Sequence, residues 1–272
     1  MTTMLFYEKP VPLNADTHMK VRLAPSDRGV GFAANTNSIP LAAVEFVDAA
    51  REFPIAFTGK DGGAMFQIVL VGVRHNENLF VTEENRWDGR YIPAFVRRYP
   101  FVLAEKQGAD DFNVYIDEAY PGFGVTDGER LFTDDGQHTA VLNHALEFLS
   151  NYQGEIVRTR LFVERLQSLD LLVPRVLDVV RANEAPLVLQ GFSVVDEQRL
   201  AALGDTELLG LIRDGYLALI YSHLGSLSNV ARLSEHLAAR LSAAAGVEGT
   251  AATEAVPAPK KKRGNGMAVQ DV

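Results

Sequence analysis

Apolar and polar residues alternate along much of the first half of the chain, whereas apolar residues recur every three or four positions in the second half. Alternation with a period of two is typical of strands, and spacing of three and four is typical of helices. The period changes at about Thr139, just after the Asp135-Gly136 turn. The pattern therefore predicts a mainly β region over residues 19–136 and a mainly helical region over residues 139–245.

The strands expected in the β region are short and separated by turns. Residues 19–32 alternate on both sides of a Pro-Ser-Asp-Arg-Gly turn, which predicts a β-hairpin. Further strands are expected over residues 54–58, 65–73, 79–82, 101–103 and 112–116. The 65–73 segment is apolar on both faces, so we expect it inside its sheet.

Two short helices framed by prolines should interrupt these strands. Pro40 suits the first position of a helix, and Pro54 disfavours helical geometry at the residue before it. A helix is therefore expected to begin near Pro40, with an apolar face made of Leu41, Val44, Phe46 and Val47. Pro93 and Pro100 frame the second helix in the same way.

The helical region begins with an apolar seam that runs from Thr139 to about Leu172, where Pro174 should stop it. A late strand is expected over residues 186–195, followed by Asp196, a residue type that caps helices. Leucines from Leu217 to Leu241 then form the stripe of a long helix, next to which His223 is expected to be packed. Residues 246–272 have the composition of a disordered tail.

Charge and composition exclude several classes of function. The 272 residues carry a net charge of −9, which disfavours binding to nucleic acid or to an anionic membrane. There is no cysteine, so disulfides, thiolate metal sites and a cysteine nucleophile are excluded. The longest uncharged stretch, residues 215–231, contains too many polar residues for a transmembrane segment. The N-terminus shows no signal-peptide pattern, which predicts a cytoplasmic location.

The sequence lacks the usual catalytic and cofactor motifs. It contains no phosphate loop, no dinucleotide fingerprint, no His-Glu-x-x-His and no Gly-x-Ser-x-Gly. His138 and His144 are six residues apart and would lie on different faces of a helix, and the acidic clusters lack the order of a calcium loop. We therefore expect no metal and no cofactor.

Two polar loops remain as the candidate binding site, and the positively charged end of the second helix lies close to them in sequence. Amides, hydroxyls, arginines and a tryptophan are residue types that bind a peptide or a carboxylate. The alternative is structural, with the amides capping a helix, Trp87 anchoring the core and the arginines paired with acids. The candidate residues are Asn35, Thr36, Asn37, Ser38, Trp87, Asp88, Arg90, Tyr91, Arg97, Arg98 and Tyr99.

Several segments together resemble the bacterial SapC family. The segments that carry the resemblance are residues 6–14 (FYEKPVPLN), 37–46 (NSIPLAAVEF), 53–55 (FPI), 78–80 (NLF), 87–101 (WDGRYIPAFVRRYPF) and 191–196 (GFSVVD). The resemblance runs from about Leu5 to Leu241 and implies a single SapC-like domain over residues 1–245. The family name implies a link to surface-array (S-layer) proteins. No catalytic residue is carried over from the family.

The expected fold is α+β, with an antiparallel sheet in the N-terminal half followed by long helices. The sheet is expected to be either open or barrel-like. The leading hypothesis is a non-enzymatic accessory or binding protein of the surface layer or cell envelope, which binds a protein or peptide at the two loops. The alternative is a cytoplasmic enzyme, or enzyme partner, that handles a peptide or amino-acid substrate. A surface location would require a dedicated secretion system.

Overall fold

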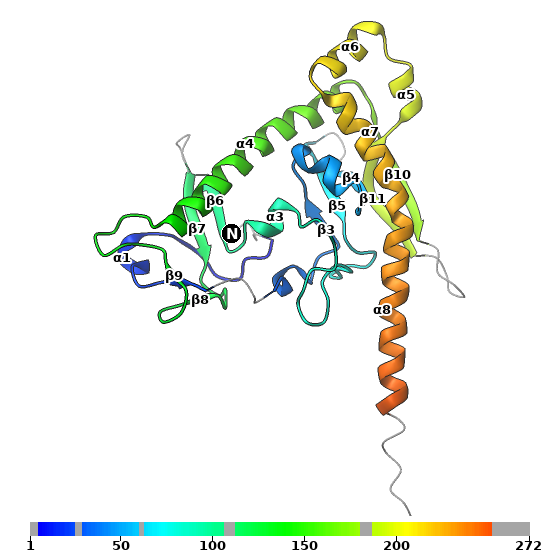
Figure 1. The fold of residues 1–272 in the computed structure, drawn as a ribbon. Coiled ribbons are helices and arrows are strands. Elements are labelled where there is room, and N and C mark those ends of the chain that lie inside the picture. The colour runs from blue at the N-terminus through cyan, green and yellow to red at the C-terminus, as the bar shows by residue number, and fades with distance from the viewer. Residues whose placement is uncertain (1–4, 25–28, 60–62, 106–111, 180–186, 252–272) are drawn as a thin grey trace, which may run out of the picture.

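The helix α4 (Ala140–Ser168) runs between two lobes of the molecule (Figure 1). The structure is a computed structural model that describes residues 5–24, 29–59, 63–105, 112–179 and 187–251. The first half of α4 packs on one hydrophobic core through Leu142 and Leu149, and its second half packs on another core through Phe162 and Leu166. We call these the small lobe (residues 7–24, 101–105 and 112–149) and the large lobe (residues 29–59, 63–100, 150–179 and 187–251).

The small lobe contains two three-stranded antiparallel sheets. One sheet has the order β1-β7-β6 and the other has the order β8-β2-β9. The strands are β1 (Pro10–Pro12), β2 (Arg22–Leu23), β6 (Phe101–Glu105), β7 (Phe112–Asp117), β8 (Phe123–Gly124) and β9 (Glu129–Arg130). The short helix α1 (Ala15–His18) begins after Asn14, whose side chain accepts a hydrogen bond from the backbone N–H of Thr17.

The large lobe contains one five-stranded antiparallel sheet with the order β10-β11-β4-β5-β3. Its strands are β3 (Ser38–Pro40), β4 (Ile55–Gly59), β5 (Met65–Leu70), β10 (Leu172–Val179) and β11 (Leu187–Val195). β11 pairs with β4 at Ser193 and Phe57, so a late strand extends a sheet that the first half of the chain begins.

The remaining elements of the large lobe are helices. The short ones are the 3₁₀ helices η1 (Gly31–Ala33) and η2 (Ala43–Glu45), with α2 (Phe46–Ala49) and α3 (Ala94–Arg97). The C-terminal ones are α5 (Glu197–Ala201), α6 (Asp205–Arg213), α7 (Tyr216–Ser226), η3 (Leu227–Asn229) and α8 (Val230–Ala251). α8 projects well beyond the sheets (Figure 1). No helix in the described part of the chain has both the length and the apolar character needed to span a membrane.

The predicted fold class is confirmed, because antiparallel sheets occupy the N-terminal half and long helices follow. The predicted late strand is β11, β5 lies inside its sheet as expected, and Asp196 caps α5 by accepting from the N–H groups of Gln198 and Arg199. α8 continues past Gly246 to Ala251, and the rest of the expected tail, residues 252–272, lies outside the described residues.

The hairpin predicted over residues 19–32 is wrong. Only Arg22 and Leu23 form a strand, β2, which pairs with β8 and β9, and residues 31–33 are the 3₁₀ helix η1. The ring of Phe32 instead stacks on Tyr99 at 3.9 Å. Alternation over a few residues does not select a strand partner, and here strands from residues 123–130 supply the pairing.

The helix predicted to begin at Pro40 begins at Ala43 instead, because Pro40 belongs to β3 and lies opposite Ile68. β3 is an edge strand, where a residue without an N–H is tolerated. The predicted apolar face is also partly wrong. Val44 and Val47 are 65% and 55% exposed, while Phe46 is fully buried.

Two further predictions fail at the boundaries of elements. α4 ends at Ser168 without help from Pro174, which lies in the edge strand β10, a strand that the pattern did not indicate. Residues 79–82 form no strand but a single bridge between Val81 and Trp87. In both places long-range packing outweighs a weak local pattern.

Candidate functional site

The eleven residues predicted for binding lie in three groups. They divide among a turn at residues 35–38, a loop at residues 87–91 and a pocket beside residues 97–99. The last two groups touch, because Arg97 donates a hydrogen bond to the Tyr91 hydroxyl at 3.5 Å and its guanidinium lies 5.8 Å from the centre of the Tyr91 ring.

The turn at residues 35–38 holds the edge of the large sheet. The backbone carbonyl of Asn37 accepts hydrogen bonds from the N–H groups of Val71 and Gly72, at 2.9 and 3.1 Å. The Thr36 hydroxyl donates to the carbonyl of Ser38 at 2.8 Å, and Asn35 is exposed. Thr36 and the Asn37 backbone therefore serve the fold.

Trp87 is half-buried and belongs to an aromatic cluster of the large lobe. Its ring lies 6.0 Å from Phe80 and 6.2 Å from Phe53, and its Nε1–H donates to the carbonyl of Tyr91 at 2.8 Å. The Asp88 carboxylate lies 3.7 Å from Nδ1 of His236 on α8. The structural alternative considered for Trp87 is thus supported by its packing.

Two buried glutamates attach the 90–94 segment to the region around α2. Glu45 accepts hydrogen bonds from the Tyr91 hydroxyl and the Ala94 N–H, both at 2.7 Å, and from the Ala42 N–H at 2.9 Å. Glu52 accepts from the N–H groups of Arg90 and Tyr91 at 2.8 and 2.9 Å. Burial, with the hydrogen bond to Glu45 as a second cause, raises the pKa of Tyr91.

Sequence reasoning missed both glutamates. Glu45 stands inside the apolar run Leu41-Ala-Ala-Val-Glu-Phe-Val47. A carboxylate is almost never fully buried unless it is paired, so an acid within such a run is a signal of a buried hydrogen-bonding anchor. That signal could have identified Glu45 but not its partners Tyr91 and Ala94, which lie far along the chain.

Asp117 in the small lobe is a third buried carboxylate that accepts backbone N–H groups of a distant segment. It accepts from the N–H groups of Glu8 and Lys9 at 2.9 and 2.8 Å and from the Tyr99 hydroxyl at 3.0 Å. Burial raises the pKa of Tyr99, and the hydrogen bond to Asp117 adds to this increase. The polar end of Tyr99, one of the predicted binding residues, is therefore already occupied.

His223 on α7 is fully buried, as the sequence predicts. Its Nε2 accepts from the Val195 N–H at 3.0 Å, so Nδ1 carries the proton and donates to the carbonyl of Ile55 at 2.9 Å. Burial lowers the pKa of His223 to about 4. Both ring nitrogens thus join α7 to β11 and β4, and neither is available as a base.

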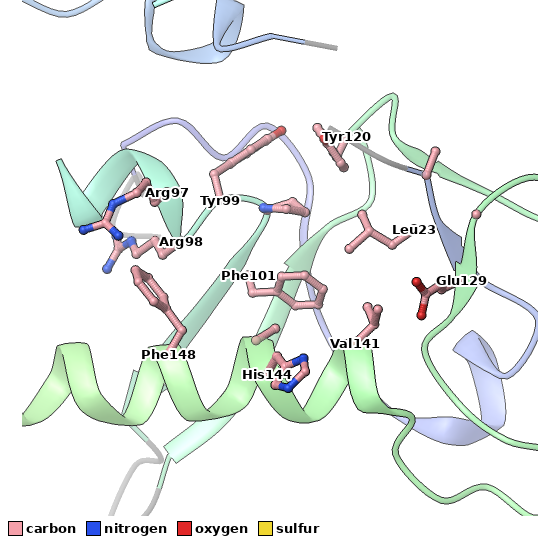
Figure 2. A pocket seen from close by; sticks show the side chains of 14 residues that line it. Leu23, Arg97, Arg98, Tyr99, Phe101, Tyr120, Glu129, Val141, His144 and Phe148 are labelled. Atoms are coloured by element: carbon pink, nitrogen blue, oxygen red, sulfur yellow. The ribbon is translucent and has the colours of Figure 1, made fainter. Parts of the chain in front are cut away.

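An open pocket of about 550 Å³ lies where α4 meets the small lobe (Figure 2). We call it the Arg97 pocket. Three of the predicted residues line it, Arg97, Arg98 and Tyr99. Its other side chains come from α4, β6 and the β8-β2-β9 sheet with its turns, and include Leu23, Phe101, Tyr120, Glu129, Val141, His144, Ala145 and Phe148.

The two arginines mark one end of the pocket. Arg97 is exposed, its Nε donates to the carbonyl of Ile92 at 2.9 Å, and its guanidinium lies 5.4 Å from the ring centre of Phe148. Arg98 lies over the ring of Phe95 at 3.8 Å, and its buried Nε makes no hydrogen bond to the described residues. Together they place two positive charges beside an apolar wall.

The opposite end of the pocket carries Glu129, and His144 lies between the two ends on α4 (Figure 2). Both side chains are exposed, and Figure 2 shows Phe101 and Val141 forming the apolar middle. Sequence reasoning missed Glu129 and missed that His144 lines a pocket, because their positions depend on how α4 packs. No group of three or more His, Asp or Glu among the described side chains could hold a metal ion.

Comparison with known proteins gives a family but no close relative of known structure or function. No curated protein matches the chain, and no solved structure matches it. The family model described as SapC matches residues 13–233 of the 272 residues. The chain belongs to the SapC family.

Proposed function

We propose that this protein is a non-enzymatic binding protein that acts in the bacterial surface layer or cell envelope and holds a peptide segment of a protein partner in the Arg97 pocket. The observation that carries this proposal is the distribution of charge in the pocket. Two guanidinium groups lie at one end, a carboxylate lies at the other, and aromatic and aliphatic side chains lie between them.

That arrangement matches the chemistry of a short peptide with free ends. An arginine fork binds a carboxylate with two parallel hydrogen bonds, and the Glu129 carboxylate can pair with an ammonium group. The apolar middle can cover an aliphatic or aromatic side chain. A volume of about 550 Å³ lies within the range of pockets that hold small ligands.

Binding without catalysis is supported by what the buried titratable groups do. Glu45, Glu52 and Asp117 each accept backbone N–H groups, and both nitrogens of His223 are bonded to the backbone. These groups stabilise loops and strands, and none of them lines the Arg97 pocket. The link to the surface layer or envelope rests on the family resemblance.

The proposal is tested by titrating the purified protein with short apolar peptides in a calorimeter. Replacing Arg97 by Gln removes the exposed guanidinium, so Kd for a peptide with a free carboxyl end should rise about tenfold or more. Arg160→Gln, an exposed arginine on α4 outside the pocket, is the matched control and should leave Kd unchanged.

The other end of the pocket provides a second variant. Glu129→Gln should remove the preference for a free amino end over an acetylated one, because the neutral amide no longer attracts an ammonium group. Unchanged peptide binding in both Arg97→Gln and Glu129→Gln would contradict the proposed site.

The second candidate function is an enzyme, or enzyme partner, that handles a peptide or amino-acid substrate. It is favoured by one observation, namely that His144 and Glu129 line the same open pocket. A histidine beside a bound substrate can act as a general base. Incubation with the peptides followed by mass spectrometry tests this candidate. Conversion of a peptide by the wild-type protein but not by His144→Gln would support the enzymatic function and contradict the non-enzymatic one.

A further inference from the structure

A second, smaller pocket lies on the large lobe and shares no lining residue with the Arg97 pocket, and three of its six lining residues are arginines. Its volume is about 170 Å³, and we call it the arginine pocket. The residues that line it are Asp48, Arg51, Glu52, Arg90, Tyr91 and Arg232. They come from three separate parts of the chain, namely α2 with its following turn, the 88–91 loop and α8.

The carboxylates do not cancel the positive charge of this pocket. Both oxygens of Glu52 accept N–H groups of the 90–91 backbone, and Arg232 approaches Glu52 only to 3.5 Å. Asp48 lies 3.4 Å from Arg51, and both side chains are largely exposed. Three guanidinium groups face two carboxylates, which leaves one net positive charge.

Arg90 is the arginine that is free to bind a ligand. Its backbone is fixed, because its N–H donates to Glu52 at 2.8 Å. Its side chain is exposed, and within the described part of the chain its guanidinium forms no hydrogen bond or ion pair. The fixed backbone keeps Arg90 at the pocket, and its unpaired guanidinium can donate to an incoming oxyanion without first breaking an ion pair.

Size and charge select the ligand group. A volume of about 170 Å³ is well below that of pockets that enclose a whole small-molecule ligand, so only a small group enters. One net positive charge balances a singly charged carboxylate better than a phosphate, which carries more than one negative charge at neutral pH.

Two exposed valines precede pocket residues by four positions, namely Val44 before Asp48 and Val47 before Arg51. Side chains four residues apart are neighbours on the surface of a helix, so we expect these valines to lie beside the pocket. The two valines are 65% and 55% exposed. They could cover an apolar side chain attached to the carboxylate.

We infer that the arginine pocket binds the C-terminal carboxylate of a peptide whose last side chain is apolar. The carboxylate lies between Arg90, Arg51 and Arg232, and the last side chain packs on Val44 and Val47. This site is separate from the Arg97 pocket and does not depend on the function proposed for it.

The test uses N-acetyl-leucyl-valine with a free carboxyl end, its C-terminal amide and inorganic phosphate, each titrated into the full chain. Binding is measured by calorimetry and by the emission of Trp87, whose Nε1–H is bonded to the Tyr91 carbonyl beside the pocket. The acid should bind at least tenfold more tightly than the amide and than phosphate. Arg90→Gln should raise Kd for the acid about tenfold or more.

Two controls separate this site from the Arg97 pocket and from general effects of charge. Arg86→Gln changes an exposed arginine of the same loop that does not line the pocket, and it should leave Kd unchanged. The titrations are also repeated in the Arg97→Gln variant, which lacks the exposed guanidinium of the Arg97 pocket, and Arg90→Gln should raise Kd by the same factor in that background. Equal binding of acid and amide, tighter binding of phosphate, or no effect of Arg90→Gln and Arg51→Gln would each overturn the inference.

Discussion

Buried carboxylates are the residues on which the loops of this protein depend. Glu45, Glu52 and Asp117 are each less than 5% exposed, and each accepts backbone N–H groups from a segment distant in sequence. A buried donor without an acceptor has lost its hydrogen bonds to water and makes none to the protein, which lowers the stability of the folded state. Each carboxylate therefore helps to hold a loop against the rest of the fold.

Replacing Glu45 by Ala should destabilise the protein strongly. Three donors, the Tyr91 hydroxyl and the N–H groups of Ala94 and Ala42, lose their acceptor. The free energy of unfolding, measured by denaturant titration, should fall by about 3–5 kcal/mol. Tyr91→Phe removes only one of these donors and should cost about 1 kcal/mol. A similar loss in both variants would contradict the role assigned to Glu45.

His223 should make the protein less stable in acid. Its pKa is about 4 in the folded state, against 6.5 for an ordinary histidine. Below pH 6.5 the unfolded chain binds a proton that the folded chain excludes, so the stabilisation is complete above pH 6.5 and is lost as the pH falls to 4. The loss amounts to about 3 kcal/mol.

The comparison with His223→Gln isolates this effect. The amide of glutamine can donate and accept hydrogen bonds but does not titrate in this range. The difference in the free energy of unfolding between wild type and variant should therefore shrink as the pH is lowered from 7 to 4. A difference that stays constant over that range would show that His223 does not titrate with a lowered pKa.

At the scale of elements, α4 determines how the two lobes are arranged. Its 29 residues carry Leu142 and Leu149 in the core of the small lobe and Phe162 and Leu166 in the core of the large lobe. Figure 1 shows the helix crossing from β6 and β7 toward α6 and α7. The Arg97 pocket lies along the first half of this helix, so its shape depends on how that half packs.

A matched pair of leucine substitutions tests whether the two cores unfold separately. Leu142 and Leu166 are both fully buried, and replacing either by Ala should cost about 3–5 kcal/mol. In hydrogen exchange, Leu142→Ala should reduce protection mainly in β6 and β7, and Leu166→Ala mainly in β4 and β5. Equal loss of protection in all four strands would mean that the lobes unfold as one unit.

At the scale of the whole molecule, the two halves of the sequence share one sheet and one hydrophobic core. β11 lies between β10 and β4 in the five-stranded sheet, and the core of the large lobe combines residues 33–96 with residues 152–237. Arg240 on α8 also donates to the carbonyl of Asn78 at 3.1 Å. The mainly β region predicted over residues 19–136 is therefore incomplete without the C-terminal region.

Truncation tests this dependence. A chain of residues 1–136 lacks β11, α4 and α7, so it leaves Ile55 and Phe57 of β4 exposed and should show no cooperative unfolding transition. A chain of residues 1–251 should unfold with the midpoint of the full-length protein, because it keeps every described element. A cooperative transition in the 1–136 chain would contradict a single domain over residues 1–245.

Cell fractionation with protease shaving of intact cells tests the proposed role in the envelope. If the protein acts at the surface layer, protease added to intact cells should remove it, and a cytosolic marker protein should stay intact. Protection of the protein together with that marker would favour the cytoplasmic candidate instead. The peptide titrations can be interpreted in either case, because they use the purified protein.

Local chemistry explains which parts of the fold and of the site could be predicted from the sequence. Asp196 caps α5 by accepting N–H groups two and three residues along the chain. The helix α4 is recognisable from apolar residues spaced at three and four positions from Thr139 onwards. Arg90 and Arg97 were recognisable as candidate binding residues by their type. The residues that line the same pockets were not recognisable, since Arg232, Glu129 and His144 take part in them only in the folded chain.

The sequence by itself determined the α+β class, the change of period near Thr139, the positions of β4, β5, β6, β7 and β11, and the family to which the chain belongs. These features depend on the order and spacing of residues that are close together in the chain. Only the tertiary structure decided that β2 pairs with β8 and β9, that β11 completes an N-terminal sheet, and which side chains line the two pockets. Such contacts join residues far apart in the chain, and their free energy depends on packing that local patterns do not encode.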